Sequence, residues 1–208
     1  MLKIINHPLI EIKLTNMRDK SADHSVFRRN LSEIGSLMIY EILRNYQTKE
    51  KVITTPLNIE YKGKTFDKEV VFVPILRAGL GMLDGLLNLV SEARVGHVGI
   101  YRDEKTHKAV EYFYKMPEVP LDSELIVVDP MLASGASAIE AIKMLQKRGF
   151  KNIKLCCLVG VKEGVRAVEQ EFGNDFEIFL ASLDEKLNDK KYIEPGLGDA
   201  GDRIFGTK

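Results

Sequence analysis

Short apolar runs alternate with segments of helical periodicity along most of the chain, and this alternation constrains the fold more than any other feature. Each run has the length of one strand and is bounded by glycine, proline or charged residues. Strand, helix and strand in succession is the pattern of parallel crossover units. We therefore predict one α/β domain over residues 1–208, with a central, mostly parallel sheet flanked by helices. The strands are expected near residues 71, 97, 126, 155 and 178.

Composition excludes several classes of function. The 30 acidic and 30 basic residues balance, which disfavours non-specific nucleic-acid binding because that binding needs a basic excess. No cleavable signal segment and no apolar run of membrane-spanning length is visible. Cys156 and Cys157 are adjacent in an apolar run, so they should point to opposite faces of a strand as buried thiols. We expect a cytoplasmic protein with no nucleic-acid partner and no membrane partner.

The first third of the chain carries one strong helical signal. Residues 1–23 predict a surface segment that leads into a helix. Apolar residues then keep a helical period from Ser25, a candidate N-cap, to about Asn45. Residues 46–69 alternate loosely, which predicts two short strands. The turns are expected at residues 56–58 and 62–64.

The segment Val-Pro-Ile-Leu-Arg-Ala-Gly-Leu-Gly-Met, at 73–82, predicts a strand-to-helix turn. Pro74 should end the strand, and a helix should carry the apolar residues up to Val90. Arg77 lies in the turn with Ala78 and Gly79. A guanidinium beside free backbone amides suits a diphosphate. The alternative is an arginine that caps the sheet edge or pairs with an acid.

A second strand-to-helix connection follows the buried run at 125–128. Pro130 should stop the strand at Asp129, and a helix should run to about Arg148. Between them lies a loop of mostly small and hydroxyl residues. Its amides, two hydroxyls and helix N-terminus would converge on one point that suits a phosphate, while Asp129 suits a sugar hydroxyl or a metal ion. The loop consists of Met131, Leu132, Ala133, Ser134, Gly135, Ala136 and Ser137.

Two further segments would lie near that point. Arg102 follows a core strand at the carboxyl edge of the sheet, where ligands bind in open parallel sheets. Residues 102–116 resemble a hairpin lid, and the alternative is a solvated surface hairpin. Residues 191–207 are rich in glycine and predict a shaped loop without a regular element. Its glycines would let main-chain groups approach a planar ligand and match a pyrimidine edge.

Three separated stretches together resemble the uracil phosphoribosyltransferases, within the type I phosphoribosyltransferase family. They are the segment at 73–82, Val-Asp-Pro-Met-Leu-Ala-Ser-Gly-Ala-Ser at 128–137, and Tyr-Ile-Glu-Pro-Gly-Leu-Gly-Asp-Ala-Gly-Asp-Arg-Ile-Phe-Gly-Thr at 192–207. The departures are mild, since Ser134 stands where the family often has Thr and keeps the hydroxyl. Ala136 replaces a frequent Gly, and Glu194 replaces a frequent apolar residue.

The resemblance implies that uracil and 5-phospho-α-D-ribose 1-diphosphate (PRPP) give UMP and diphosphate, a reaction of pyrimidine salvage. It also implies Mg²⁺ that is carried by PRPP without direct protein ligands, and a hood over the site formed by both termini and the hairpin lid. The implied catalytic residues are Arg77, Arg102 and Asp129. The implied PRPP-binding residues are these three with Ala78, Gly79, Pro130, Met131, Leu132, Ala133, Ser134, Gly135, Ala136, Ser137 and Asp199. The implied uracil-binding residues are Ile193, Gly198, Asp199 and Ala200, acting mostly through main-chain groups.

Other interpretations stay open at this point. A regulator of the same fold that binds RNA would need a basic face. A transferase for a purine or for orotate is a closer rival, and orotate would need a cation such as Arg203 for its carboxylate. The resemblance further implies a homodimer or a larger homo-oligomer, for which the long helix after residue 25 could supply an interface. It implies GTP as an effector in some members, and no residue in the sequence decides this.

Overall fold

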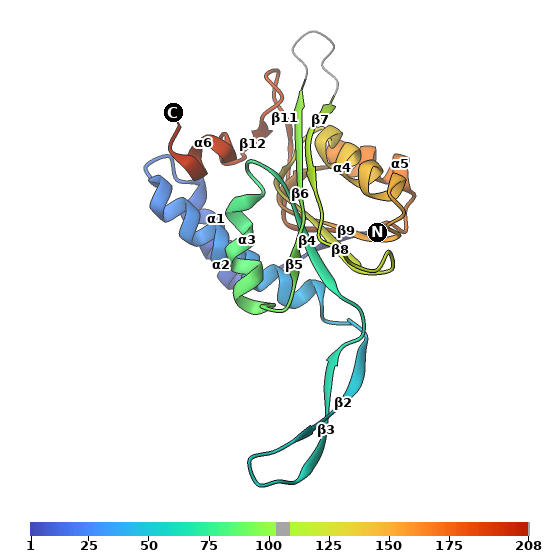
Figure 1. Cartoon of the computed structure of the whole chain (residues 1–208). Helices are drawn as coiled ribbons and strands as arrows, with labels where there is room; N and C mark the ends of the chain where they lie inside the picture. The colour runs from blue at the N-terminus through green and yellow to red at the C-terminus, as the bar shows by residue number, and fades with distance from the viewer. Residues whose placement is uncertain (103–108, 208) are drawn as a thin grey trace.

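The computed structural model describes residues 1–102 and 109–207 (Figure 1). Its centre is an eight-stranded sheet in which seven strands follow one another and β5 (Arg94–Val95) pairs beside β4. All pairings are parallel except the one between β6 and β7, which confirms the predicted mostly parallel sheet. The spatial order is β1 (Leu2–Ile4), β10 (Ile178–Asp184), β9 (Asn152–Val161), β8 (Glu124–Leu132), β4 (Val70–Leu76), β6 (His97–Arg102) and β7 (Ala109–Lys115).

Helices cover both faces of this sheet. Figure 1 shows α1 (Pro8–Arg18), α2 (His24–Ile42) and α3 (Leu80–Leu89) on one side, and α4 (Ala136–Lys147) and α5 (Lys162–Phe172) on the other. Alternate residues of β4 separate the two cores: Phe72 packs with the first group and Val73 with the second. Both are fully buried, as expected for a strand covered on two faces. Cys156 and Cys157 divide between the two cores in the same way and are free thiols, as predicted.

Both prolines that were expected to end strands lie inside them. β4 continues through Pro74 to Leu76, and β8 continues through Pro130 to Leu132. Pro74 lies where the β5 ladder has ended and the β6 ladder has not yet begun. The pairing of β8 with β4 ends at Val128, so Pro130 lies beyond it on a strand paired only with β9. A missing donor costs little where a ladder is interrupted, and the strands therefore reach further toward the site.

The N-terminal segment is more regular than predicted. His7 caps α1 by accepting a hydrogen bond from Leu9 N at 3.1 Å, and the helix buries Ile10, Leu14 and Met17. This spacing of four and three residues is the helical signal that the sequence carried. The N-cap of α2 is Asp23 rather than Ser25, because its carboxylate accepts from Val26 N at 2.8 Å. The helix ends at Ile42, three residues before the predicted end.

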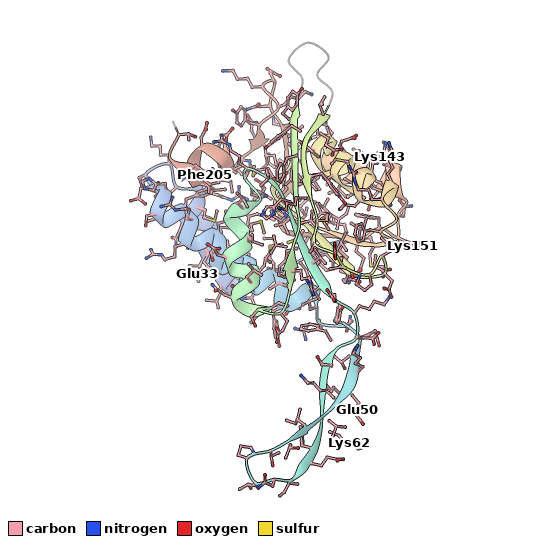
Figure 2. The ribbon with its side chains drawn as sticks, in the orientation of Figure 1. Glu33, Glu50, Lys62, Lys143, Lys151 and Phe205 are labelled. Atoms are coloured by element: carbon pink, nitrogen blue, oxygen red, sulfur yellow. The ribbon has the colours of Figure 1, made fainter. Side chains whose placement is uncertain are left out.

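Residues 46–69 form the two predicted strands, β2 (Thr48–Thr54) and β3 (Glu60–Phe66), which pair as an antiparallel hairpin. The turn predicted at 62–64 is wrong, because Gly63 pairs with Lys51 inside the hairpin. The hairpin projects away from the rest of the domain (Figure 1). The Glu50 and Lys62 side chains, which lie on the hairpin, are well separated from the body of the domain (Figure 2). We call this hairpin, residues 48–66, the β-arm.

The C-terminal segment is not the purely irregular loop that was predicted. It contains β12 (Ile193–Glu194), paired with β11 (Lys186–Leu187), and α6 (Ala200–Phe205), which contacts α2. Asp199 caps α6 by accepting from Asp202 N at 2.9 Å, so a cap with a following apolar pair allowed a short helix. The N- and C-terminal segments therefore lie together, as the predicted hood requires. Within residues 1–102 and 109–207, no helix combines the length and apolarity that crossing a bilayer demands.

Candidate active site

The carboxyl ends of β8, β4 and β6 lie next to one another in the sheet, and they carry the predicted site residues. Arg77, Ala78 and Gly79 connect β4 to α3, and the loop after Asp129 connects β8 to α4. Gly79 lies so close to β8 that a Cβ built on it would be 2.5 Å from the Val128 carbonyl oxygen. Only glycine fits that approach, so the arginine turn is held directly against the strand that ends in Asp129.

The third segment reaches the same place from the C-terminus. The Arg77 guanidinium carbon lies 5.6 Å from the centroid of the Phe205 ring. Gly81, at the start of α3, faces the Ile204 side chain, which a Cβ on Gly81 would meet at 2.9 Å. Residues of all three segments also share one apolar cluster, which contains Ala78, Met131, Ala133, Ile193, Leu197, Ala200 and Ile204. The structure thus brings together the three stretches that the sequence analysis singled out.

The loop after β8 has the form of an anion site. Gly135 occupies the N-cap position of α4 with φ of 82°, a left-handed conformation that favours glycine, and contributes no side-chain cap. The first amides of α4 therefore point toward the loop without a capping side chain from that position. Ala136 and Ser137, expected in the loop, form the first turn of the helix. Behind the loop, Gly164 of α5 lies so close that a Cβ there would be 2.3 Å from the Ala133 carbonyl oxygen.

Asp129 is the acid of this site. Its Oδ1 accepts a hydrogen bond from Met131 N at 3.2 Å, and among the described residues no basic side chain forms an ion pair with it. Burial raises the pKa of Asp129 to about 7, and the hydrogen bond from Met131 opposes this rise. A half-buried carboxylate of this kind is stabilised by a ligand that brings hydroxyl donors or positive charge.

The C-terminal segment offers main-chain groups rather than reactive side chains. Ile193 and Ala200 are buried, while Gly198 and Asp199 are exposed between them. Gly198 adopts φ of 78°, which a residue with a Cβ rarely does. The capping role of Asp199 was not foreseen from the sequence. The hydrogen bond from Asp202 occupies Oδ1 of its carboxylate.

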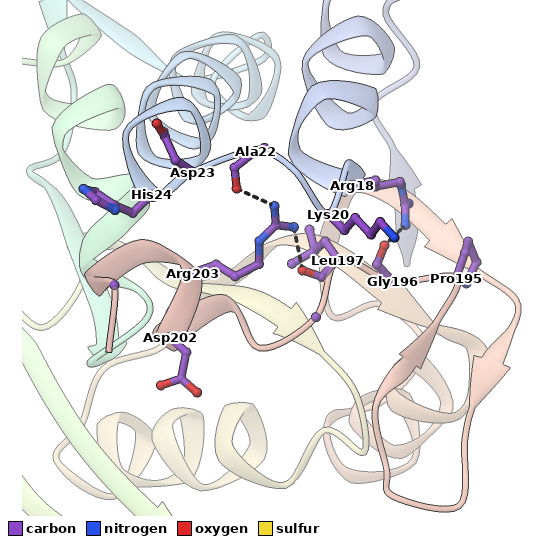
Figure 3. Close-up of a pocket in the computed structure, with 12 residues that line it drawn as sticks. Arg18, Lys20, Ala22, Asp23, His24, Pro195, Gly196, Leu197, Asp202 and Arg203 are labelled. Carbon is purple, nitrogen blue, oxygen red and sulfur yellow. Dashed lines mark hydrogen bonds between the residues drawn. The ribbon is translucent and has the colours of Figure 1, made fainter. Parts of the chain in front are cut away.

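The hollow shown in Figure 3 lies between this segment and the connection from α1 to α2, and not at the three-segment junction. It has a volume of about 530 Å³, and its lining comes from the connection between α1 and α2 and from residues 195–206. A second cavity of about 600 Å³ lies at the opposite end of the sheet, around Lys3 and Phe179. Neither is lined by Arg77 or Asp129, so we place the site by its chemistry and geometry at the open carboxyl edge.

Arg102 ends β6, which pairs with β7 as the predicted hairpin, but its side chain and residues 103–108 lie outside the described residues. Sequence reasoning missed Arg18 and Asp184, which hold the C-terminal segment in place. Asp184 carried a usable signal, since it is an acid at the end of an apolar strand, like Asp129.

Comparison with solved structures defines the class. A purine phosphoribosyltransferase from Pyrococcus horikoshii matches with a TM-score of 0.52 and 16% sequence identity, over 75% of this chain and 84% of that chain. Similarity at this identity concerns the fold alone. With the arginine turn and the loop after Asp129 at the carboxyl edge of the sheet, it defines the fold as that of the type I phosphoribosyltransferases.

The family follows from the sequence. The family model for uracil phosphoribosyltransferase matches residues 4–207. The uracil phosphoribosyltransferase of Mycoplasmopsis agalactiae is 69% identical over 208 residues, which is 100% of both chains. The solved structure of an Aquifex aeolicus protein is 36% identical with a TM-score of 0.93, over 100% of this chain and 99% of that one. This chain belongs to the uracil phosphoribosyltransferase family.

Proposed function

We propose that this protein transfers the 5-phosphoribosyl group of PRPP to uracil and releases UMP and diphosphate. One observation carries the proposal: Gly79 lies against Val128, and Arg77 lies over Phe205, so the three segments meet at one edge of the sheet. This transfer needs a loop that binds the 5-phosphate, an arginine that binds the diphosphate and main-chain groups that bind the base. Membership of the family supports the same reaction.

The roles follow from the charge that develops as diphosphate leaves. Carbon 1 of the ribose becomes cationic, so the site has to stabilise the departing anion and hold uracil N1 in line behind that carbon. Arg77, with the amides of Ala78 and Gly79, would bind the diphosphate, and Arg102 would add a second guanidinium. The loop from Met131 to Ser137 would hold the 5-phosphate.

Asp129 would accept hydrogen bonds from the ribose hydroxyls and stabilise the cationic ring. Asp199 would lie beside the sugar diphosphate while it caps α6. Uracil would be recognised by main-chain groups of Ile193, Gly198 and Ala200, next to Asp199. Recognition by the backbone accounts for the small number of polar side chains in this segment and makes its exact shape decisive.

Mg²⁺ would enter on PRPP and neutralise charge on the departing diphosphate. The donor set fits this arrangement, because the described residues contain no group of three or more His, Cys, Asp or Glu side chains that could hold a metal by themselves. Asp129 is the carboxylate that we assign to the ribose hydroxyls. Its raised pKa marks a site that gains from an incoming cation.

Turnover with a set of bases tests the proposal. The purified protein is incubated with PRPP, Mg²⁺ and, in turn, uracil, orotate, hypoxanthine and adenine, and nucleotides are separated by chromatography. We expect UMP alone. Orotate is disfavoured because Arg203 already donates to the carbonyl oxygens of Met17, Asp19, Ala22 and Leu197. Formation of another nucleotide at a higher rate would overturn the choice of base, and GTP added to the same assay tests its effector role.

We also propose that the protein acts in the cytoplasm as a homodimer or larger homo-oligomer. The β-arm supports the oligomer better than α2 does, because α2 buries its apolar face within the domain. An isolated two-stranded hairpin is only marginally stable in water. Every residue of β2 is exposed, and Leu57 and Ile59 at the tip are 79% and 60% exposed. A second copy of the chain would cover these side chains.

A further inference from the structure

In the proposed function, main-chain groups of the segment from Ile193 to Ala200 bind the base. The backbone of this segment therefore has to be held in one conformation by contacts with the rest of the domain. Gly196 and Gly198 both adopt positive φ, of 61° and 78°, and glycine has the widest choice of conformations in an unconstrained chain. A flexible loop would lose conformational entropy each time a base bound, and this would weaken binding.

Gly196 is held on both of its main-chain polar groups. Its N–H donates to Oδ2 of Asp184 at 2.9 Å, and its carbonyl oxygen accepts from Nη1 of Arg18 at 2.7 Å. Arg18 and Asp184 are themselves joined by two hydrogen bonds of 2.7 Å, one from each Nη atom. The pair and the glycine therefore form a closed ring of contacts, which we call the Gly196 clamp.

The two clamp side chains come from regular secondary structure of the domain. Arg18 is the last residue of α1, and Asp184 is the last residue of β10 with a side chain only 3% exposed. Ser182 Oγ donates to Oδ1 of Asp184 at 2.8 Å, so both carboxylate oxygens accept two hydrogen bonds. Burial alone would raise the pKa of Asp184, but hydrogen bonds from Arg18, Ser182 and Gly196 bring it below its usual value. The two parallel hydrogen bonds between Arg18 and Asp184 fix the relative orientation of the side chains as well as stabilising their contact.

Arg203 extends the same arrangement by one residue. Its Nη1 donates to the Leu197 carbonyl oxygen at 3.0 Å, and its Nη2 donates to that of Asp19 at 2.8 Å. Figure 3 shows Arg18, at the end of α1, reaching the Gly196 carbonyl, and Arg203, on α6, reaching the carbonyls of Leu197 and Ala22. Two consecutive peptide groups, directly before the exposed Gly198, are thus tied to elements outside the loop.

We propose that Arg18 and Asp184 are positioning residues for uracil: through the Gly196 clamp they hold the backbone of residues 193–200 in the shape that binds the base. Neither side chain touches a reacting atom. Their effect falls mainly on the base, because the proposed PRPP site is built largely from the segments after β4 and β8, and only Asp199 of that site belongs to the clamped segment. The inference rests on the proposed role of residues 193–200 in uracil binding.

The test is the double variant Arg18→Met/Asp184→Asn, which removes both charges so that no buried charge is left unpaired. We expect the KM for uracil to rise by roughly tenfold or more, while the KM for PRPP changes by less than about twofold, as loss of an interaction specific to one substrate does. Arg18→Lys keeps the charge but loses the forked guanidinium that contacts both Asp184 and Gly196, so it should also raise the KM for uracil. It also serves if the double variant does not fold. Lys13→Met is the matched control, because Lys13 lies on α1 like Arg18 but pairs with Glu33 of α2 instead of with the loop.

Hydrogen exchange without any substrate gives the second readout. Amides of residues 193–200 should exchange faster in the double variant than in the wild type, with no change in the Lys13→Met control. Unchanged exchange and unchanged uracil KM in a folded variant would overturn the clamp alone. Faster exchange with an unchanged uracil KM would show that the loop is clamped but does not bind uracil, which overturns both the inference and the proposed base site. Equal increases in both KM values would overturn selectivity for the base.

Discussion

The Arg77 guanidinium faces the Phe205 ring at 5.6 Å, although the two residues are separated by more than half of the chain. This contact lies within the range of a cation–π interaction. It joins the turn proposed to bind diphosphate to the segment proposed to bind uracil. The two substrates would therefore meet where the chain's first and last site segments touch.

Arg77→Ala should slow both the forward reaction and the reverse reaction, in which diphosphate attacks UMP. Loss of one group that stabilises developing charge costs on the order of 100- to 1000-fold in turnover. Steady-state rates in both directions measure this. Arg44→Ala is the control, because Arg44 is exposed after α2 and pairs with Glu41. A reverse rate equal to that of the wild type would remove Arg77 from diphosphate binding.

Asp129→Asn should lower turnover and remove a pH dependence of stability. The folded pKa of about 7 lies above the ordinary value of 3.8, so the folded protein binds the proton more tightly. The free energy of unfolding of the wild type should therefore fall as pH rises from about 4 to about 7. The asparagine variant does not ionise, so its free energy of unfolding at pH 8 should exceed that of the wild type by up to a few kcal/mol.

Denaturant unfolding from pH 4 to pH 8 measures this difference between Asp129→Asn and the wild type. Asp84→Asn, at an exposed position on α3, is the control and should follow the wild type. If Asp129→Asn and the wild type keep the same slope of unfolding free energy against pH, Asp129 does not have the raised pKa assigned to it. If turnover also stays unchanged, its place in the mechanism is lost.

Gly79→Ala should disturb the junction of two site segments. The added Cβ would lie 2.5 Å from the Val128 carbonyl oxygen and 2.7 Å from Ile75 N and O, which are backbone atoms that cannot move aside. We expect a loss of stability of about 1–3 kcal/mol, typical of overpacking, together with reduced turnover. Gly63→Ala is the control, because its added Cβ would meet the movable Tyr61 ring at 3.2 Å and the Lys51 carbonyl oxygen at an ordinary contact distance of 3.6 Å. Thermal unfolding and UMP formation, measured together, decide the outcome, and a fully active Gly79→Ala would contradict this close approach.

The sequence predicted the sheet well because periodicity and burial depend on local residue order. Five apolar runs became β4, β6, β8, β9 and β10. The predicted strand ends at Pro74 and Pro130 were wrong, because the free-energy cost of a proline in a strand depends on whether a neighbouring strand is paired at that position. Such a fact belongs to the assembled sheet and not to the local sequence.

The site was predictable where one segment carries the chemistry, and hidden where distant residues cooperate. The loop after Asp129 was recognisable from the small residues that follow an apolar strand. The Gly196 clamp joins Asp184 and Gly196, which are 12 positions apart, to Arg18, which precedes Asp184 by 166 positions, and each residue has an ordinary local context. Asp199 was predicted as a ligand-binding acid, and its cap on α6 became visible only once the short helix was seen.

The β-arm allows a last prediction about assembly. Leu57→Lys/Ile59→Lys places two charges at the exposed tip, where they stay in water and cost little in the isolated chain. If a second copy covers the tip, burying these charges opposes association, and sedimentation equilibrium should show smaller species than for the wild type. Lys62→Ala changes the strand of the same arm without adding charge and should leave the mass unchanged. An unaltered assembly in the double variant would show that the subunits meet elsewhere, and a monomeric wild type would refute the oligomer itself.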